Sequence, residues 1–152
     1  MYDPYIDLKR QYADYAALQQ EVSTRLLERV EHRRSEPGLI TCIGCGDGQA
    51  PAAMKKQFRK ARVVALDTSP AMLALAGKKS SLLRPFERVC ASAAALPFAD
   101  RSVDLLIADL AGHWRYDGAA LMEGYRRVLK ANGMLLFSSL GIGSLSALSI
   151  EA

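Results

Sequence analysis

Three glycines at alternating positions, Gly44, Gly46 and Gly48, follow an apolar run in the stretch LITCIGCGDGQA. The run itself, 39–43, is typical of a buried strand, and the segment after the glycines is helix-like. A turn needs only one or two glycines, so three in one loop indicate that another group approaches the main chain closely. A glycine-rich loop between a strand and a helix favours an α/β fold with a ligand site at that loop.

The rest of the chain predicts alternating helices and strands. Apolar residues recur every three to four positions over about 10–34, which predicts an amphipathic N-terminal helix. A later helix is expected to start with Ser69 as its N-cap and Pro70 in its first turn. The other expected helices cover about 49–60 and 116–133, and the expected strands are 39–43, 62–66 and 86–92, with two more beginning at 103 and 134.

This alternation predicts an α/β fold, a Rossmann-like doubly wound parallel sheet of about five strands with an N-terminal helix. The 152 residues are expected to form one domain over 1–152, with an N-terminal helical segment at 1–36 and the sheet-forming core at 37–152. In such sheets ligands bind at the carboxyl ends of the strands, where the strand order reverses.

Composition and charge narrow the function classes. The chain has no run of about 18 apolar residues, so no membrane span is expected. Its N-terminus lacks the apolar segment of a signal peptide, so we expect a cytoplasmic protein. The net charge is +4, with basic residues gathered at 55–62 and 78–88. These clusters indicate either a solvated helix face or a docking surface for an acidic partner, a nucleic acid or a carrier protein.

The cysteines do not predict a metal site. Cys42 and Cys45 form a C-x-x-C pair, but the chain has no second pair, and its two histidines, His32 and His113, fall outside metal-ligand spacing. Cys42 also lies in an apolar run and is expected to be a small buried hydrophobe. We expect free thiols and no metal.

The spacing of the glycines excludes two phosphate-binding motifs and favours a third kind of site. A dinucleotide fingerprint needs glycine at position 49, which is Gln49, and no Gly-Lys-Ser/Thr follows as in a P-loop. Asp67 closes the next strand, where its carboxylate would accept hydrogen bonds from both hydroxyls of a ribose. We expect a ligand with a ribose and no pyrophosphate, and interpret it as S-adenosylmethionine. A tight turn without a ligand, and a helix-capping role for Asp67, are the alternatives.

Longer stretches carry a family resemblance. YADYAALQQEVSTRLLERV, VVALDTSPAML, AALPFADRSVDLLIADLAGHW and YRRVLKANGMLLFSSLG resemble class I S-adenosylmethionine-dependent methyltransferases. Within that class they are most similar to the malonyl-acyl-carrier-protein O-methyltransferases of biotin synthesis, over about 12–148. The resemblance implies an S-adenosylmethionine cofactor, O-methylation of a free carboxylate on a malonyl-acyl-carrier-protein type of substrate, and an acidic acyl carrier protein as partner.

The resemblance also implies site residues. Catalytic positions are expected at Tyr12, His113 and Trp114. Packing is an equal alternative for the tyrosine and the favoured one for the tryptophan, and a structural role in a loop is an equal alternative for the histidine. The implied cofactor-binding residues are Gly44, Cys45, Gly46, Gly48, Asp67, Thr68, Met72, Ser92, Ala93 and Asp109.

The chain departs from the resembled pattern at three places. Cys42 stands where the family has an acid that orients the methionine amino group, and Ser92 where it has an acid facing adenine. The family also continues with two more strands and a substrate lid, whereas this sequence ends at SIEA. The last strand is therefore expected to be an edge that a second copy or another chain covers.

Two alternatives to a carboxylate O-methyltransferase remain open. The departures are compatible with a catalytically degenerate pseudo-methyltransferase that acts as a scaffold or partner subunit. A nucleic-acid methyltransferase is disfavoured, because the chain lacks the Asn/Asp-Pro-Pro-Tyr/Phe signature and an aromatic and basic stacking platform.

Overall fold

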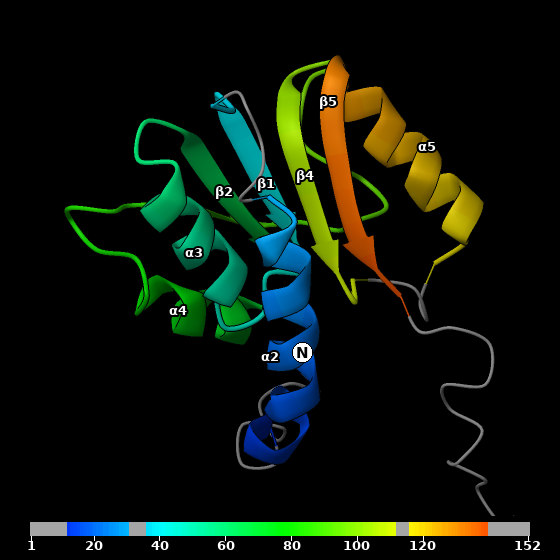
Figure 1. The fold of residues 1–152 in the computed structure, drawn as a ribbon. Coiled ribbons are helices and arrows are strands. Elements are labelled where there is room, and N and C mark those ends of the chain that lie inside the picture. The colour runs from blue at the N-terminus through cyan, green and yellow to red at the C-terminus, as the bar shows by residue number, and fades with distance from the viewer. Residues whose placement is uncertain (1–11, 31–35, 112–115, 140–152) are drawn as a thin grey trace, which may run out of the picture.

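Helices and strands alternate along the chain as predicted. The computed structural model describes residues 12–30, 36–111 and 116–139. The elements, shown in Figure 1, are α2 (Tyr12–Glu28), β1 (Leu39–Ile43), α3 (Gln49–Gln57), β2 (Arg62–Asp67), α4 (Pro70–Gly77), β3 (Glu87–Cys90), β4 (Val103–Asp109), α5 (Gly118–Val128) and β5 (Leu129–Ser138).

The strands form one five-stranded sheet in the order β3-β2-β1-β4-β5, and neighbouring strands pair in parallel. Cys42 of β1 lies opposite Ala65 of β2 on one side and Ile107 of β4 on the other. The strand order reverses between β1 and β4, so a crevice is expected outside the carboxyl ends of these two strands. This topology confirms the predicted Rossmann-like doubly wound sheet.

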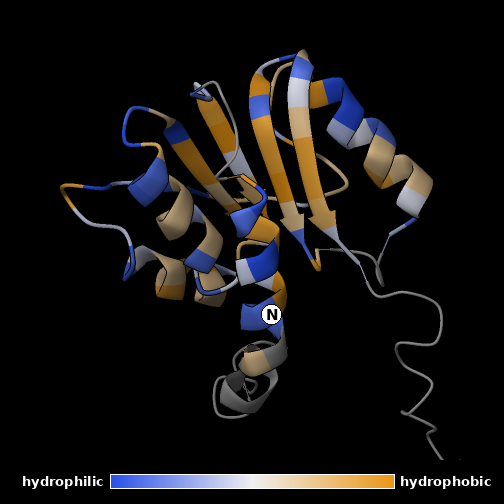
Figure 2. Cartoon of the chain, in the orientation of Figure 1, coloured by the Kyte–Doolittle hydropathy of each residue, from blue (hydrophilic) through white to orange (hydrophobic). Residues whose placement is uncertain are grey.

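Apolar side chains cover both faces of the sheet, as buried parallel strands require. On one face, Ile40 and Cys42 pack in a cluster with residues of α2, α3 and α4; on the other, Ile43 and Leu106 pack with residues of α5. Figure 2 shows the strands as largely apolar ribbons, with polar residues gathered on the helices and connecting loops. Helices on both faces place the loops at the strand ends, where the crevice lies.

The start of α4 follows the prediction. The Oγ of Ser69 accepts a hydrogen bond of 3.3 Å from the backbone N–H of Met72, and Pro70 occupies the first turn. The hydroxyl therefore satisfies one of the free N–H groups at the helix start, and proline needs no partner there.

Three predicted helix ends were wrong, among them the end of α3, which was expected near 60 and lies at Gln57. The last helix was expected to reach 133, but α5 stops at Val128, whose carbonyl accepts a hydrogen bond of 2.9 Å from the N–H of Ser102. Leu129 is already extended and pairs with Val103, so β5 begins five residues earlier than predicted. The N-terminal helix was expected to continue to 34, but α2 ends at Glu28; residues 31–35 lie outside the described part of the chain.

The two outer strands of the sheet are β3 and β5. Phe137 of β5 is 51% exposed, although Ser138 beside it is half-buried. Over the described ranges, no helix combines the length and the apolar character that crossing a bilayer requires.

Candidate functional site

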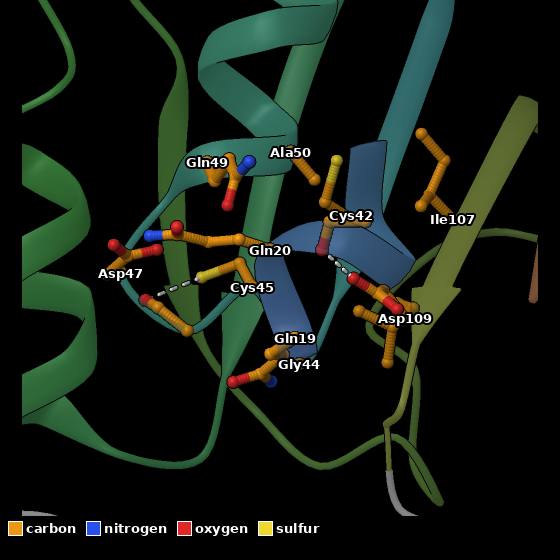
Figure 3. A pocket seen from close by; sticks show the side chains of 13 residues that line it. Gln19, Gln20, Cys42, Gly44, Cys45, Asp47, Gln49, Ala50, Ile107 and Asp109 are labelled. Carbon is orange, nitrogen blue, oxygen red and sulfur yellow. Dashed lines mark hydrogen bonds between the residues drawn. The ribbon is translucent and has the colours of Figure 1, made fainter. Parts of the chain in front are cut away.

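A pocket lies at the carboxyl ends of β1 and β4, where the strand order reverses (Figure 3). Its walls come from α2, the end of β1, the glycine loop, the first turn of α3 and the end of β4. The lining residues are Gln19, Gln20, Ser23, Cys42, Ile43, Gly44, Cys45, Gly46, Asp47, Gln49, Ala50, Ile107 and Asp109.

The glycine loop needs glycine for reasons internal to the protein. Gly44, Gly46 and Gly48 all have positive φ, of 62°, 54° and 88°. A Cβ at Gly44 would lie 2.7 Å from the Cβ of Ala111, and one at Gly48 would lie 2.7 Å from the Cα of Ala76. The groups that approach the main chain at these two positions are therefore neighbouring alanines of the fold, and the backbone conformation adds to the same requirement.

Asp67 ties the glycine loop to the start of α4. Its Oδ2 accepts a hydrogen bond of 3.0 Å from the N–H of Gly46, and its Oδ1 accepts one of 2.9 Å from the N–H of Ser69. Each carboxylate oxygen has two acceptor positions, and each of these bonds occupies one of them. The contact with the N-cap residue Ser69 also supports the capping alternative, so both roles are compatible with the geometry.

The other implied cofactor-binding residues follow β1, β2 and β3. Asp67 lies opposite Cys90 in the sheet, which brings Ser92 and Ala93 to the same edge. The Oγ of Ser92 donates a hydrogen bond of 2.9 Å to the Oη of Tyr116. Thr68 is exposed and Met72 and Ala93 are buried, and none of the expected set Gly48, Asp67, Thr68, Met72, Ser92 and Ala93 is in the lining of the pocket.

Asp109 joins three elements at the pocket wall. Ser23 of α2 donates a hydrogen bond to its Oδ2, and Ser138 of β5 donates one of 2.5 Å to its Oδ1. The Oγ of Ser138 in turn accepts a hydrogen bond of 2.9 Å from the N–H of Leu110, which has a positive φ of 49°. The carboxylate is therefore oriented from both sides by hydroxyl groups.

Cys42 and Cys45 are free buried thiols in the pocket lining. Burial raises the pKa of Cys42 far above its ordinary value, and the neighbouring Cys45 raises it further. Burial, followed by the nearby Asp67 and Asp47, raises the pKa of Cys45 to about 12. Both thiols are neutral at pH 7, so position 42 supplies no negative charge. Among the described residues, no three His, Cys, Asp or Glu side chains are placed to hold a metal ion.

Sequence reasoning expected Tyr12 of α2 at the site but missed the part of this helix that lines the pocket. Gln19, Gln20 and Ser23 line it, and Ser23 is buried at 7% exposure. The four-residue spacing of Gln19 and Ser23 puts them on one helix face. The available signal in the sequence was a polar residue, Ser23, beside the apolar stripe of the helix. This signal did not predict that the helix face lies against the ends of β1 and β4.

The expected catalytic residues are not placed by the structure. His113 and Trp114 lie outside the described residues, and so does the side chain of Tyr12, whose backbone begins α2. From the expected cofactor-binding set, the pocket brings together Gly44, Cys45, Gly46 and Asp109.

Comparison with known proteins assigns the family. A model of the methyltransferase domain matches residues 41–137. Malonyl-[acyl-carrier protein] O-methyltransferases of Xylella fastidiosa and Halorhodospira halophila are 39% and 37% identical to this chain, each over 86% of this chain and 44% of the relative. The chain spans about half the length of the curated relatives it matches.

Solved structures show the same fold. A chain of the Haloferax volcanii complex between the Trm112 methyltransferase activator and a methyltransferase has a TM-score of 0.76 at 22% identity, over 91% of this chain and 61% of that one. The plantazolicin methyltransferase BpumL in complex with SAH has a TM-score of 0.72 at 20% identity, over 95% and 58%. The family resemblance read from the sequence is confirmed, and the chain belongs to the methyltransferase domain family.

Proposed function

We propose that this chain binds S-adenosylmethionine and acts in methyl transfer to a carboxylate. The observation that carries the proposal is the pocket between the glycine loop and Asp109 at the reversal of strand order. Gly48, the residue before α3, provides no side-chain cap, so the N–H groups of Gln49 and Ala50 in the lining remain available to a ligand. The positive end of a helix suits the carboxylate of an amino acid.

We infer a donor set along the length of the cofactor, of which the pocket lining includes the glycine loop and the first turn of α3. The N-terminus of α3 would hold the amino-acid carboxylate, the glycine loop would lie along the chain towards sulfur, and Asp67 would accept from the ribose. Ser92 and Ala93 would border the adenine. When bound, S-adenosylmethionine supplies a methyl group on a positively charged sulfur, ready for in-line displacement by a nucleophile.

The proposed acceptor is the free carboxylate of a malonyl group on an acyl carrier protein. The support is the activity for which the relatives that are 34–39% identical over most of this chain are named. A carboxylate is ionised near neutral pH, because carboxyl groups titrate near 4. The reaction therefore needs no general base, and the protein would act by alignment and by excluding water, which together supply about 7–11 kcal/mol in favourable cases.

A surface near the pocket fits an acidic carrier protein. Lys79 forms an ion pair of 2.6 Å with Asp47 of the pocket lining, and a few residues further on Leu82 and Leu83 are 101% and 93% exposed. The N–H of Arg84 closes this turn by donating to the carbonyl of Ser81 at 3.1 Å. Two exposed leucines beside basic residues offer an acidic partner both apolar contact and charge complementarity.

Titration calorimetry with S-adenosylhomocysteine tests the cofactor assignment. Binding at micromolar affinity, together with a raised melting temperature, is the expected result. Methyl transfer to malonyl-acyl-carrier protein and to malonyl-coenzyme A then tests the acceptor. Replacing Leu82 and Leu83 with serine should weaken use of the carrier-linked substrate at least threefold and leave malonyl-coenzyme A unaffected. No heat of binding at millimolar ligand would contradict the enzyme assignment.

The second candidate is a pseudo-methyltransferase that keeps the fold as a scaffold. The neutral, buried thiol of Cys42 favours it, because no charge is available at that position for the cofactor. Micromolar binding of S-adenosylhomocysteine by the unmodified chain would remove this candidate.

We also propose that a second copy or another chain covers β5. The strand lies at the edge of the sheet and carries the half-exposed Phe137. Light scattering should show a mass above that of the monomer, and Phe137→Lys should shift it towards the monomer. A monomeric wild-type chain at high concentration would contradict this. A cytoplasmic location stays a prediction from the sequence.

A further inference from the structure

We propose that Asp109 is the residue that binds the ammonium group of the cofactor's amino-acid part, with Ser23 and Ser138 as its positioning residues. The inference rests on the proposed function and names which side chain makes this cofactor site specific for a free amino group. It depends on the chemistry of the pocket lining and on the direction in which the strands present their side chains.

The charge of the pocket lining favours a cation at Asp109. Its lining contains two carboxylates, Asp47 and Asp109, and no lysine, arginine or histidine. Asp47 is neutralised by its ion pair with Lys79 at 2.6 Å. Over the described ranges, Asp109 has no ion pair within 4 Å, and its recorded partners are the hydroxyl groups of Ser23 and Ser138. A half-buried carboxylate without a cation attracts one.

Asp109 lies at the end of β4, in the wall of the pocket. Ile43 lies opposite Ala108 in the last pair of the β1–β4 ladder. Asp109 is the last residue of β4 and Gly44 the first residue after β1, so both lie at the carboxyl edge of the sheet, and both line the pocket. Side chains two positions apart share a sheet face, so Asp109 projects from the same face as Ile107, on the side of the pocket (Figure 3).

The pocket presents opposite charges that match a zwitterionic ligand. The uncapped N-terminus of α3, at Gln49, offers partial positive charge on one side of the pocket, and Asp109 offers negative charge on another. An α-amino acid carries its carboxylate and ammonium on one carbon and needs such a pair of opposite partners. Cys42 lines the same pocket, but its thiol is neutral and offers the ammonium no negative charge.

The hydroxyl groups prepare the carboxylate for this role. Each donates to a different oxygen of Asp109, one from α2 and one from β5. Because a carboxylate oxygen accepts more than one hydrogen bond, the ammonium can bind without breaking either contact. The rotamer of Asp109 is therefore set before the ligand arrives, which lowers the entropy lost on binding.

The test compares two ligands on three proteins by titration calorimetry. S-adenosylhomocysteine carries the ammonium, and its deaminated analogue, which keeps the carboxylate, does not. On the wild type, removal of the ammonium should weaken binding at least tenfold. On Asp109→Asn the same change in ligand should weaken binding less than threefold. Asp47→Asn is the matched control, and it should keep the tenfold preference of the wild type.

The outcomes are distinct from those that test the cofactor site itself. If the wild type binds neither ligand, the proposed function fails and this inference with it. If the wild type binds both ligands equally, or Asp109→Asn keeps the full tenfold preference, the cofactor site stands and the role of Asp109 is overturned. The role is also overturned if Asp109→Asn weakens both ligands by the same factor, which is the result of a structural role alone. Asp109→Ser, compared with the same two ligands, replaces the asparagine variant if that variant does not fold.

Discussion

The carboxylate of Asp67, at the end of β2, accepts a hydrogen bond of 3.0 Å from the backbone N–H of Gly46 in the loop after β1. The acid and the glycines that together suggest a nucleoside site are thus in direct contact with each other. Contacts within the protein hold this part of the site in place. The effect of Asp67 on stability can therefore be measured without a ligand, apart from its effect on binding.

Asp67→Ala should lower the free energy of unfolding by about 1–3 kcal/mol without any ligand, because the N–H groups of Gly46 and Ser69 lose a charged acceptor. Urea denaturation measures the change. Asp100→Ala is the control, since the side chain of Asp100 is 74% exposed in its ion pair and should contribute no more than about 1 kcal/mol. Equal stability of Asp67→Ala and wild type would show that Asp67 serves ligands alone.

Gly48→Ala should destabilise the fold by about 2–4 kcal/mol, from left-handed strain and from overpacking. The new Cβ would lie 2.7 Å from the Cα of Ala76, which is backbone and cannot move aside cheaply. Thermal unfolding is the measurement.

Gly124→Ala is the matched control for Gly48→Ala. A Cβ at Gly124 meets nothing within 4 Å, and the residue lies inside α5, so alanine should raise stability by about 0.5–1 kcal/mol. Two equal effects would contradict the packing role assigned to Gly48.

Asp104→Asn should reduce stability by about 1–3 kcal/mol near pH 7. Burial alone would raise the pKa of Asp104, but the N–H of Leu39, the ammonium of Lys130 and the N–H of Gly38 outweigh it and lower the pKa below the ordinary value. A lowered folded pKa means that the carboxylate stabilises the fold above its unfolded pKa of about 3.9.

The stability difference between wild type and Asp104→Asn should therefore be constant above about pH 5 and shrink as the pH falls below about 4, through the folded pKa. Chemical denaturation at a series of pH values checks this. A difference that persists unchanged at pH 2 would mean that size or shape, and not charge, explains the variant.

Tyr125→Phe should leave stability unchanged or raise it by about 1 kcal/mol. The Tyr125 hydroxyl is buried and has no hydrogen-bond partner among the residues described, and burial raises its pKa. Tyr116→Phe is the comparison, because it removes the acceptor of the Ser92 hydroxyl and should cost about 0.5–1.5 kcal/mol. Denaturant melts in parallel test the pair; a large loss at Tyr125 would indicate a partner that the described residues do not include.

Much of the architecture could be predicted from the sequence because it depends on local pattern. The strand at 39–43, the capping by Ser69 and the five-strand parallel sheet all follow from apolar periodicity and turn chemistry. The end of α5 at Val128 could not be predicted, because the carbonyl of Val128 accepts a hydrogen bond from an N–H 26 positions earlier in the chain, at Ser102.

The sequence by itself determined the fold class, the family and the loop at which a ligand would bind, because spacing along the chain encodes which residues turn, pair and cover a face. Only the tertiary structure decided what the individual residues contact. It brought Ser23, Asp109 and Ser138 together from three elements, and it set Gly48 against Ala76. Such contacts depend on how the helices lie on the sheet. Packing between residues far apart in the chain determines that arrangement, so no local sequence pattern predicts it.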